Sequence, residues 1–393
     1  MLSEDSFKLV KIIKPTKKKQ GSKEIDIFLS YFYKALLKNT NMDSIVNNIK
    51  YNNEPYQFDS NSNFLSFDVK KQIELLNYKT YNFKFKLKNT VFDVKFLTLN
   101  DVNISIIYYY LKQIYNLYTL LSNLSFLKNK NYFKIVIFFS DIKKMRPKNK
   151  LSILNADNVN TGYTYCNSNE PEIVLYRNEE WFKVLIHETM HAIGLDFCNF
   201  NNKGVNDSIL DIFPINIKLN LYETYCEIWA ILLNLIFISY ELCNSFKGFK
   251  TIFMYNYNFE NNFQVFQMNK VLNFMDLKYE HLYSKEEKHA IKRQGFYREK
   301  TNVFCYYILK SILFYNLSDF LLFCKENNRN YIYFSKTEKN LINFSNLIKN
   351  NYNNESFLKT IKNISHKYNS KINKNSYIQK TFRLSIFDYI YLY

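Results

Sequence analysis

The stretch "VLIHETMHAIGLDF", Val184 to Phe197, constrains this chain most. It places two of only five histidines four residues apart, with a glutamate directly after the first. Residues four apart share one face of an α-helix, and the apolar flanks predict that this helix is buried on at least one side. Asn178 is the expected N-cap, with Glu179 and Glu180 in the first turn. Gly194 is the expected left-handed end of the helix.

His187 and His191 can direct their imidazoles at one zinc ion from this face. Glu188 lies one position round the helix, where it reaches water on the metal without ligating the metal. In this HExxH arrangement the glutamate acts as general base. Zinc lowers the pKa of its water to about 7, so Glu188 would take that proton during attack on a carbonyl. The alternative is a helix with two ordinary histidines, but buried imidazole and carboxylate groups need partners.

A hydrolytic zinc site needs a third protein ligand and one open position. A histidine six residues after the second would stand at Phe197, so the three-histidine pattern is absent. Asp196 is one candidate, although it lies beyond the glycine that ends the helix. The stretch Asn220 to Leu235 predicts a strongly apolar helix with two acids, Glu223 and Glu227, on one face. One of them could ligate zinc and the other could orient a ligand histidine, unless both are solvated.

HExxH followed by a helix with a glutamate and an acid four residues later resembles the gluzincin metallopeptidases, the thermolysin-like group. The resemblance implies zinc-dependent hydrolysis of peptide bonds, with Glu223 as third zinc ligand and Glu227 as partner of a ligand histidine. The family's "NExxxD" is "YETYCE" here, so which glutamate binds zinc stays open. The context "IVLYRNEEWFKVLIHETMHAIGLDF" is also similar to uncharacterised metallopeptidases of large DNA viruses. The overlap covers about residues 155 to 240.

The rest of the chain predicts an α/β (α+β) fold, which the resemblance implies is zincin-like, with a twisted mixed sheet packed on the active-site helix. Alternation from Tyr81 predicts two strands joined by a turn, and longer apolar periodicity predicts helices. We expect three segments: 1–80 with a basic arm and a helix, 81–240 as the zincin-like core, and a mainly helical 241–393. The expected elements are helices over 25–39 and 103–124, strands over 132–141 and 172–177, and a terminal strand or docked tail over 382–393.

Two further roles need residues outside the motif. The strand Glu172 to Arg177 directly precedes the active-site helix, so we expect it to be the sheet edge that binds a peptide by strand addition. An interior strand fits its sequence equally well. A tetrahedral intermediate also needs an electrophile. The region after residue 278 offers His281, Tyr297 and Tyr306, which the sequence does not rank.

Composition bears on partners and location. The net charge is +18, but the lysines are scattered, and the one dense run, Lys14 to Lys23, is expected to be a solvated arm. Nucleic acid is therefore a less favoured partner than a peptide or protein substrate. The six cysteines form no CxxC pair, which favours reduced thiols. The abundance of Lys, Asn, Ile, Tyr and Phe is typical of an A/T-rich genome, such as that of a parasite, a bacterium or a large DNA virus.

No signal-peptide-like run opens the chain, and the most apolar run, Ile228 to Tyr240, falls short of the ~20 residues of a membrane span. We expect a buried helix there and an intracellular, cytoplasmic protein, in host cytoplasm or virion if viral. The competing function is a zincin-like structural or interaction protein that binds metal without turnover, such as a virion component. Glu188 favours the enzyme, because zinc binding alone does not require it.

Overall fold

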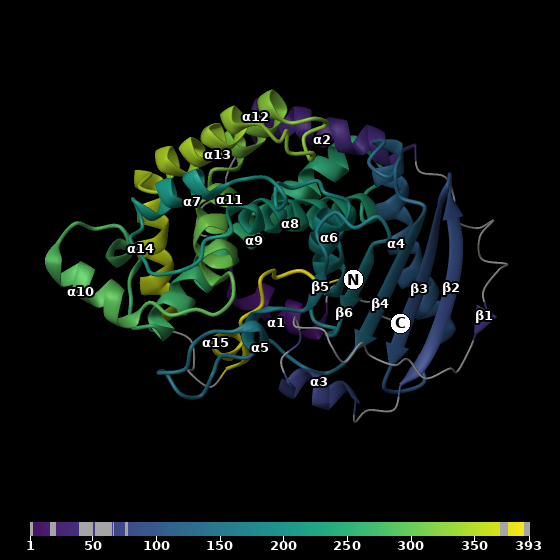
Figure 1. Ribbon diagram of the computed structural model, residues 1–393, viewed down its shortest axis with the longest axis horizontal. Coiled ribbons are helices and arrows are strands. Elements are labelled where there is room, and N and C mark those ends of the chain that lie inside the picture. The colour runs from purple at the N-terminus through teal and green to yellow at the C-terminus, as the bar shows by residue number, and fades with distance from the viewer. Residues whose placement is uncertain are drawn as a thin grey trace.

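The protein combines a sheet at one end with a large helical body at the other (Figure 1). The computed structural model describes residues 3–15, 21–38, 50–51, 65, 67–74, 78–369 and 376–388. Residues 16–20 of the expected basic arm lie outside these ranges. The predicted α+β class is confirmed. The strands are β1 Lys50–Tyr51, β2 Lys79–Leu87, β3 Thr90–Thr98, β4 Tyr132–Phe139, β5 Gly162–Thr164 and β6 Glu172–Leu175.

The six strands are ordered β1-β2-β3-β4-β6-β5. β2 and β3 form the predicted antiparallel hairpin, whose turn has Lys88 at φ 53°. β3, β4 and β6 run parallel, and β5 pairs antiparallel with β6. The prediction that Glu172 to Arg177 forms the sheet edge is wrong, because β6 lies between β4 and β5. Its "EIVL" sequence suits a strand buried on both faces, whereas β5 is only three residues, "GYT", too short to show a pattern.

The two faces of the sheet bury different clusters. Alternate residues of a strand point to opposite faces, so Ile135 and Ile137 of β4 join the main core while Val136 and Phe138 join a smaller cluster. The main core also takes in α4 (Ile104–Asn123) and α6 (Trp181–Ala192), and the smaller cluster takes in α3 (Phe67–Glu74). The helix predicted over 103–124 is confirmed as α4.

The helix predicted to carry His187, Glu188 and His191 is confirmed as α6, but its start differs from the prediction. It begins at Trp181, and its N-cap is Glu180 in the left-handed conformation at φ 62°, not Asn178. Glu179 and Glu180 are not in the first turn, because both are buried and bound elsewhere. Gly194 ends the helix at φ 69° as predicted. A Cβ there would lie 3.0 Å from the Asn167 side chain. Both the positive φ and this close contact favour glycine at position 194.

Helix α8 (Leu221–Glu241) packs along α6 in the interior. It is long and apolar enough to cross a membrane, but 89% of its most apolar window is buried inside the protein. The pair Phe304–Tyr315 and Leu317–Asn327 passes the same test only if joined, and it is bent by 91°. The residues that the structure describes therefore contain no clear transmembrane segment, and the buried helix predicted over 228–240 is confirmed.

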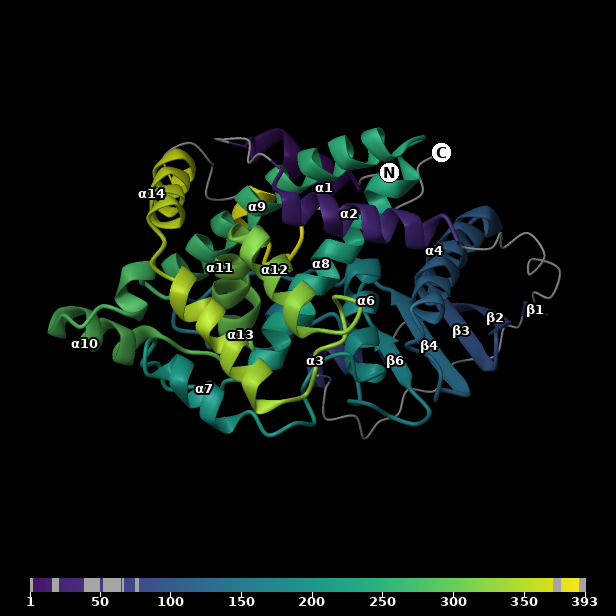
Figure 2. The same cartoon turned by 90° about the horizontal axis from the view of Figure 1, so that it is seen from above.

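The C-terminal half is mainly helical, as predicted, and α2 from the N-terminal segment lies across it beside α8, α9 and α12 (Figure 2). One hydrophobic core includes residues from all three expected segments. The remaining helices are α1 Glu4–Ile12, α2 Lys23–Leu36, α5 Ala156–Val159, α7 Lys203–Leu210, α9 Phe246–Phe274, the 3-10 helix η3 Tyr279–Leu282, α10 Glu287–Phe296, α12 Leu317–Asn327, α13 Glu338–Asn351, α14 Glu355–Asn369 and α15 Tyr377–Lys380.

A π-helix, η4 (Phe304–Leu309), continues into α11 (Lys310–Tyr315) and packs against α8. π-helical turns are rare and occur often at functional sites. Tyr306 lies within this turn and Lys310 directly follows it. Both side chains reach acids of α8, at distances given below.

Residues 381–388 form a docked segment rather than a strand, which settles the alternative left open for the described part of 382–393. Phe382 N donates to the Lys144 carbonyl at 2.7 Å. Leu384 N donates to Glu180 at 2.8 Å, and Asp388 accepts from Glu180 N at 2.7 Å. Residues 389–393 lie outside the described ranges. The segment therefore fixes the start of α6.

Candidate metal centre

Three donor atoms from α6 and α8 converge on one point. His187 Nε2 lies 3.1 Å from His191 Nε2 and 3.2 Å from Glu223 Oε2. His191 Nε2 lies 3.4 Å from the same carboxylate oxygen. The histidines meet because they are four residues apart on α6, and Glu223 reaches them from the first turn of α8. All three side chains are largely buried, with side-chain exposures of 7%, 7% and 12%.

The outer nitrogen of each histidine faces a carboxylate. His187 Nδ1 lies 3.1 Å from Glu227 Oε2, and His191 Nδ1 is hydrogen-bonded to Asp196 Oδ2. A carboxylate at Nδ1 favours the tautomer with the proton on that nitrogen. Both Nε2 atoms then carry lone pairs, and they face a third acceptor, Glu223. Three converging acceptors repel one another unless a proton or a cation lies between them.

Glu227 belongs to a fully buried ionic group. Its Oε1 lies 2.5 Å from Lys183 Nζ and 3.4 Å from Lys310 Nζ, and none of the three side chains is more than 1% exposed. Burial acts to raise the pKa of Glu227, but Lys183, Lys310 and His187 outweigh it and the pKa is lowered. Glu227 is therefore ionised and held in place behind His187.

Glu188 differs from the other acids at the centre. It is 8% exposed, and among the described residues its carboxylate makes no hydrogen bond or ion pair. Burial raises its pKa, although His187 and His191 oppose the shift. Glu188 and His187 line a cavity of about 40 Å³ together with Thr161 and Gly162. That volume has room for a few water molecules, so the free carboxylate faces a space where water fits.

The protonation of the metal-free centre follows from its charges. Burial acts to lower the pKa of His187, but the hydrogen bonds with Glu223 and Glu227 outweigh it and the pKa is raised. Burial likewise acts against His191, yet Cys226, Asp196 and Glu223 raise its pKa well above the ordinary value. The pKa of Glu223 is lowered, because the two histidines outweigh its burial. The raised pKa values of the two histidines and the lowered pKa of Glu223 both favour protonated imidazoles beside an ionised carboxylate.

Only one of the three candidate electrophiles lies at this centre. Tyr306 Oη donates to Glu223 Oε2 at 3.0 Å, and its ring is 5.8 Å from the His187 ring. Tyr297 instead donates to Glu299 at 2.7 Å. His281 accepts from Lys278 N at 3.1 Å and packs on His289. The structure gives neither of them a contact with His187, His191 or Glu223.

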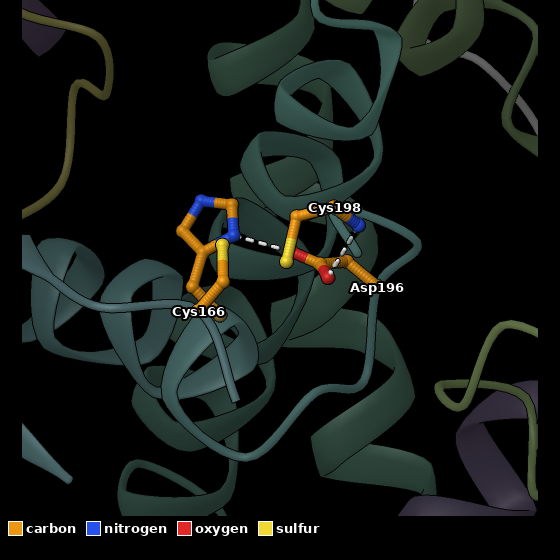
Figure 3. A group of neighbouring side chains, drawn as sticks. Cys166, Asp196 and Cys198 are labelled. Carbon is orange, nitrogen blue, oxygen red and sulfur yellow. Dashed lines mark hydrogen bonds and ion pairs between the residues drawn. The ribbon is translucent and has the colours of Figure 1, made fainter. Parts of the chain in front are cut away.

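Asp196 is fully buried behind His191, among sulfur atoms. Cys226 Sγ donates to Asp196 Oδ2 at 3.2 Å, and Cys198 N donates to Oδ1 at 3.0 Å. Cys166 and Cys198 lie beside Asp196 (Figure 3). The hydrogen bond with Cys198 is the main cause that lowers the pKa of Cys166 to about 6. Asp196 thus lies behind His191 as its hydrogen-bond partner, and does not approach the Nε2 side where Glu223 stands.

Sequence reasoning missed the lysines and the sulfur atoms around the centre. Lys183 precedes His187 by four residues, so the helical spacing that paired the histidines would also have placed it on their face. No spacing in the sequence indicates that Lys310 lies at the centre, because its position depends on the π-helical turn before it. The cysteines are separated by 32 or 28 residues along the chain, and only folding brings them together.

Comparison of the chain with protein-family models, with curated proteins and with solved structures found no match to any of them.

Proposed function

We propose that the protein is a zinc-dependent metallopeptidase of the zincin-like type. The observation that carries the proposal is the convergence of His187 Nε2, His191 Nε2 and Glu223 Oε2 on one point beside the unpaired carboxylate of Glu188. Either feature alone also occurs in proteins that catalyse no reaction. Together they combine a cation-binding set with a free base, which is the minimum that hydrolysis by a metal-activated water requires.

The three donors fit zinc in kind and in spacing. Nitrogen and oxygen donors about 2.1 Å from a tetrahedral zinc ion lie about 3.4 Å from one another. The observed separations are 3.1, 3.2 and 3.4 Å. Two histidines and one carboxylate leave the fourth position of a tetrahedron open, as in catalytic zinc sites. Glu227 and Asp196 would fix the orientation of the two imidazoles.

A zinc ion held by these donors supplies a Lewis acid and a nucleophilic water at neutral pH. Glu188 accepts a proton from water in the cavity beside it and returns the proton to the departing amine nitrogen. Its raised pKa suits both transfers, because an ordinary carboxylate is too weak a base near neutrality. Tyr306 Oη, now bonded to Glu223, is a side-chain donor at the centre for an oxygen that gains negative charge.

The peptide substrate would lie along β5. Among the described strands β5 pairs only with β6, so strand addition would use its other edge. Gly162 lets β5 approach the active-site helix closely, because a Cβ there would stand 2.9 Å from the Val174 carbonyl and 3.3 Å from Val184. A peptide added at this edge would pass the cavity that Glu188 and His187 line.

The test combines metal analysis with hydrolysis of a mixed peptide library by the full chain. We expect wild-type protein to contain zinc and to cleave peptides. Glu188→Gln should keep its zinc and lose about 100-fold or more in turnover, because general base catalysis contributes about that factor. His191→Ala should lose the metal. Glu170→Gln, at an exposed glutamate, is the matched control and should behave as wild type.

A metal-binding structural role is the alternative, and the burial of the centre favours it, since no donor side chain is more than 12% exposed. It predicts wild-type protein that contains zinc but cleaves no peptide. Unchanged hydrolysis by Glu188→Gln would overturn the role of Glu188, and wild-type protein without zinc would overturn the metal centre itself.

A further inference from the structure

Three of the six cysteines gather behind His191, on the side away from Glu223. Cys226 Sγ lies 3.7 Å from His191 Nδ1. Cys166 and Cys198 form a separate group of possible metal ligands with His191 and Asp196. Cys166 and Cys198 are half-buried, whereas Cys226 is fully buried in α8. The partly exposed pair therefore has an approach from solvent that Cys226 lacks.

Four donor atoms in this group lie within 4.8 Å of one another: one each from Cys166, His191, Asp196 and Cys198. They come from the β5–β6 loop, from α6 and from the loop after α6. Sulfur donors about 2.3 Å from a tetrahedral zinc ion lie about 3.8 Å apart. The set must therefore contract by about 1 Å at most to hold an ion, which side-chain rotation alone can supply.

The backbone around these donors is already fixed. Asn167 N donates to the His191 carbonyl at 2.8 Å, so the residue after Cys166 is tied to the end of α6. Asn199 Nδ2 donates to the Cys166 carbonyl at 3.4 Å, which ties the residue after Cys198 to the first loop. The left-handed Gly194 turns the chain so that Asp196 and Cys198 follow directly. Both loops are held without help from a metal.

Positive charge lies next to this group. Lys130 Nζ donates to Asn167 Oδ1 at 3.2 Å, and Lys336 Nζ donates to the Gly194 carbonyl at 3.2 Å. Thiolates and a carboxylate around one divalent ion carry a net negative charge, and two nearby ammonium groups reduce the cost of that charge.

We propose that Cys166, Cys198, Asp196 and the Nδ1 atom of His191 form a second metal site, which takes a thiophilic divalent cation such as zinc or cadmium. Two thiolates, one carboxylate and one imidazole nitrogen are donors that select such ions over magnesium or calcium. Binding releases the two thiol protons and the proton that His191 shares with Asp196 to solvent, because each donor coordinates in its deprotonated form. His191 would then bridge two ions through its two nitrogens.

This second site goes beyond the proposed peptidase activity and needs no turnover. It shares only His191 with the first site. Variants that lack His187 and Glu223 therefore remove the first site alone, and variants that lack the two cysteines remove the second alone.

The experiment is a cobalt(II) titration of the metal-free full chain with a non-thiol reductant present. Cobalt bound to thiolates absorbs in the near ultraviolet, whereas cobalt bound to histidine and carboxylate alone does not. We expect wild type to bind two equivalents and to show the thiolate band. Cys166→Ser with Cys198→Ser should bind one equivalent and lose the band. His187→Ala with Glu223→Gln should also bind one equivalent but keep the band.

Cys243→Ser is the matched control, because Cys243 is half-buried and its thiol bonds only the Tyr240 carbonyl, at 3.2 Å. It should keep both equivalents and the full band. A wild-type titration without the band, or a band that persists in the Cys166→Ser/Cys198→Ser protein, overturns the second site. If the His187→Ala/Glu223→Gln protein binds as many cobalt equivalents as wild type and the cysteine variant binds fewer, the first site is overturned while the second is supported.

A second measurement needs no variant and so does not depend on the folding of one. Wild-type protein is alkylated with iodoacetamide with and without cadmium, and the modified cysteines are mapped by mass spectrometry. Cadmium should slow the labelling of Cys166 and Cys198 by at least tenfold and leave Cys243 unchanged. Equal labelling of Cys166 with and without cadmium would contradict the proposal.

Discussion

His187 and His191 face each other with their Nε2 atoms, but the groups around their Nδ1 atoms differ. Behind His187 stands Glu227, held by the ammonium groups of Lys183 and Lys310 in an interior without solvent access. Behind His191 stands Asp196, held by a backbone N–H and a thiol, with two half-buried cysteines beside it. One orienting carboxylate is part of an ionic core that joins three helices, and the other lies in a loop.

This difference separates two tasks. The Glu227 side joins α6, α8 and α11 through charges that cannot be left unpaired, so it contributes to the fold as well as to the centre. The contacts of Asp196 contribute little to the fold beyond its own loop. Asp196 can therefore form other contacts without disturbing the rest of the protein. We therefore expect changes on the two sides to have similar effects on zinc affinity and very different effects on stability.

Lys183→Met should give the largest effect. Methionine keeps the helix and the volume, but it leaves Glu227 with one lysine at 3.4 Å. Removing one partner of a buried pair costs about 3–5 kcal/mol. The free energy of unfolding, measured by urea denaturation of the metal-free protein, should fall by that amount.

Lys134→Met is the matched control. Lys134 also pairs with a glutamate, Glu172, at 2.7 Å, but the two side chains are 33% and 40% exposed. Exposed pairs contribute about 0–1 kcal/mol. Equal losses of stability in the two variants would show that the Glu227 group is not the ionic core described above.

Glu227→Gln and Asp196→Asn test whether both carboxylates orient a histidine for metal binding. Each amide keeps the shape of the side chain but weakens the bond to the outer nitrogen of one histidine. Loss of such a partner lowers metal affinity by about 10–100-fold. In the Cys166→Ser/Cys198→Ser background, which lacks the proposed second site, chelator competition should give similar losses of zinc affinity for the two proteins, whereas only Glu227→Gln should also destabilise the metal-free fold. A fall in zinc affinity in only one of the two variants would show that the two carboxylates do not have equivalent roles.

The pH dependence of the metal-free protein follows from the raised pKa values of both histidines. Each contributes stability that is fully present below about pH 6.5 and is lost as the pH rises through its folded-state pKa. Every tenfold gain in proton affinity on folding corresponds to about 1.4 kcal/mol of that stability. The melting temperature in a chelator should therefore fall from pH 6 to pH 9. The lowered pKa of Glu223 acts at the acid end, where stability is lost as the pH falls.

Zinc should reverse this slope, since it competes with protons for the same nitrogens and binds better at higher pH. Asp196→Asn and Glu227→Gln should each flatten the metal-free profile, because each removes a carboxylate that raises the pKa of one histidine. A profile that is flat in wild-type protein would contradict the protonation described for the metal-free centre.

Cys226→Ala should have the smallest effect. It removes a thiol donor 3.2 Å from Asp196 Oδ2, while the bonds of Asp196 with His191 and Cys198 N remain. We expect a loss of about 1 kcal/mol in stability and less than a threefold change in zinc affinity. A change as large as that of Asp196→Asn would mean that Cys226, rather than Asp196, fixes the orientation of His191.

Much of the fold could be predicted because its signals are local. Alternation identified β2 and β3, helical periodicity identified α4, α6 and α8, and Gly194 marked the end of α6. The same local rule put His187, Glu188 and His191 on one helix face. The pairing of α6 with Glu223 on α8 came from a family resemblance and from the spacing of two acids, not from any rule about how helices pack.

The remainder depends on distant contacts. β5 is too short to show alternation, so β6 was mistaken for the edge strand. The start of α6 could not be read from Asn178 because Glu179 and Glu180 pair with Lys144 and with the segment 381–388 instead of facing water. Asp196 follows a left-handed glycine, and only the folded turn shows that it lies behind His191 rather than beside Glu223.

The docking of residues 381–388 also has a consequence for synthesis on the ribosome. Glu180, at the start of α6, bonds Leu384 N and Asp388, partners that are translated 204 and 208 residues later. A nascent chain that already contains both histidines, both α8 glutamates and Lys144, the ion-pair partner of Glu180, still lacks these two anchors of the helix start. If the centre binds a metal as proposed, its donors therefore reach their final geometry only after residues 381–388 have been translated.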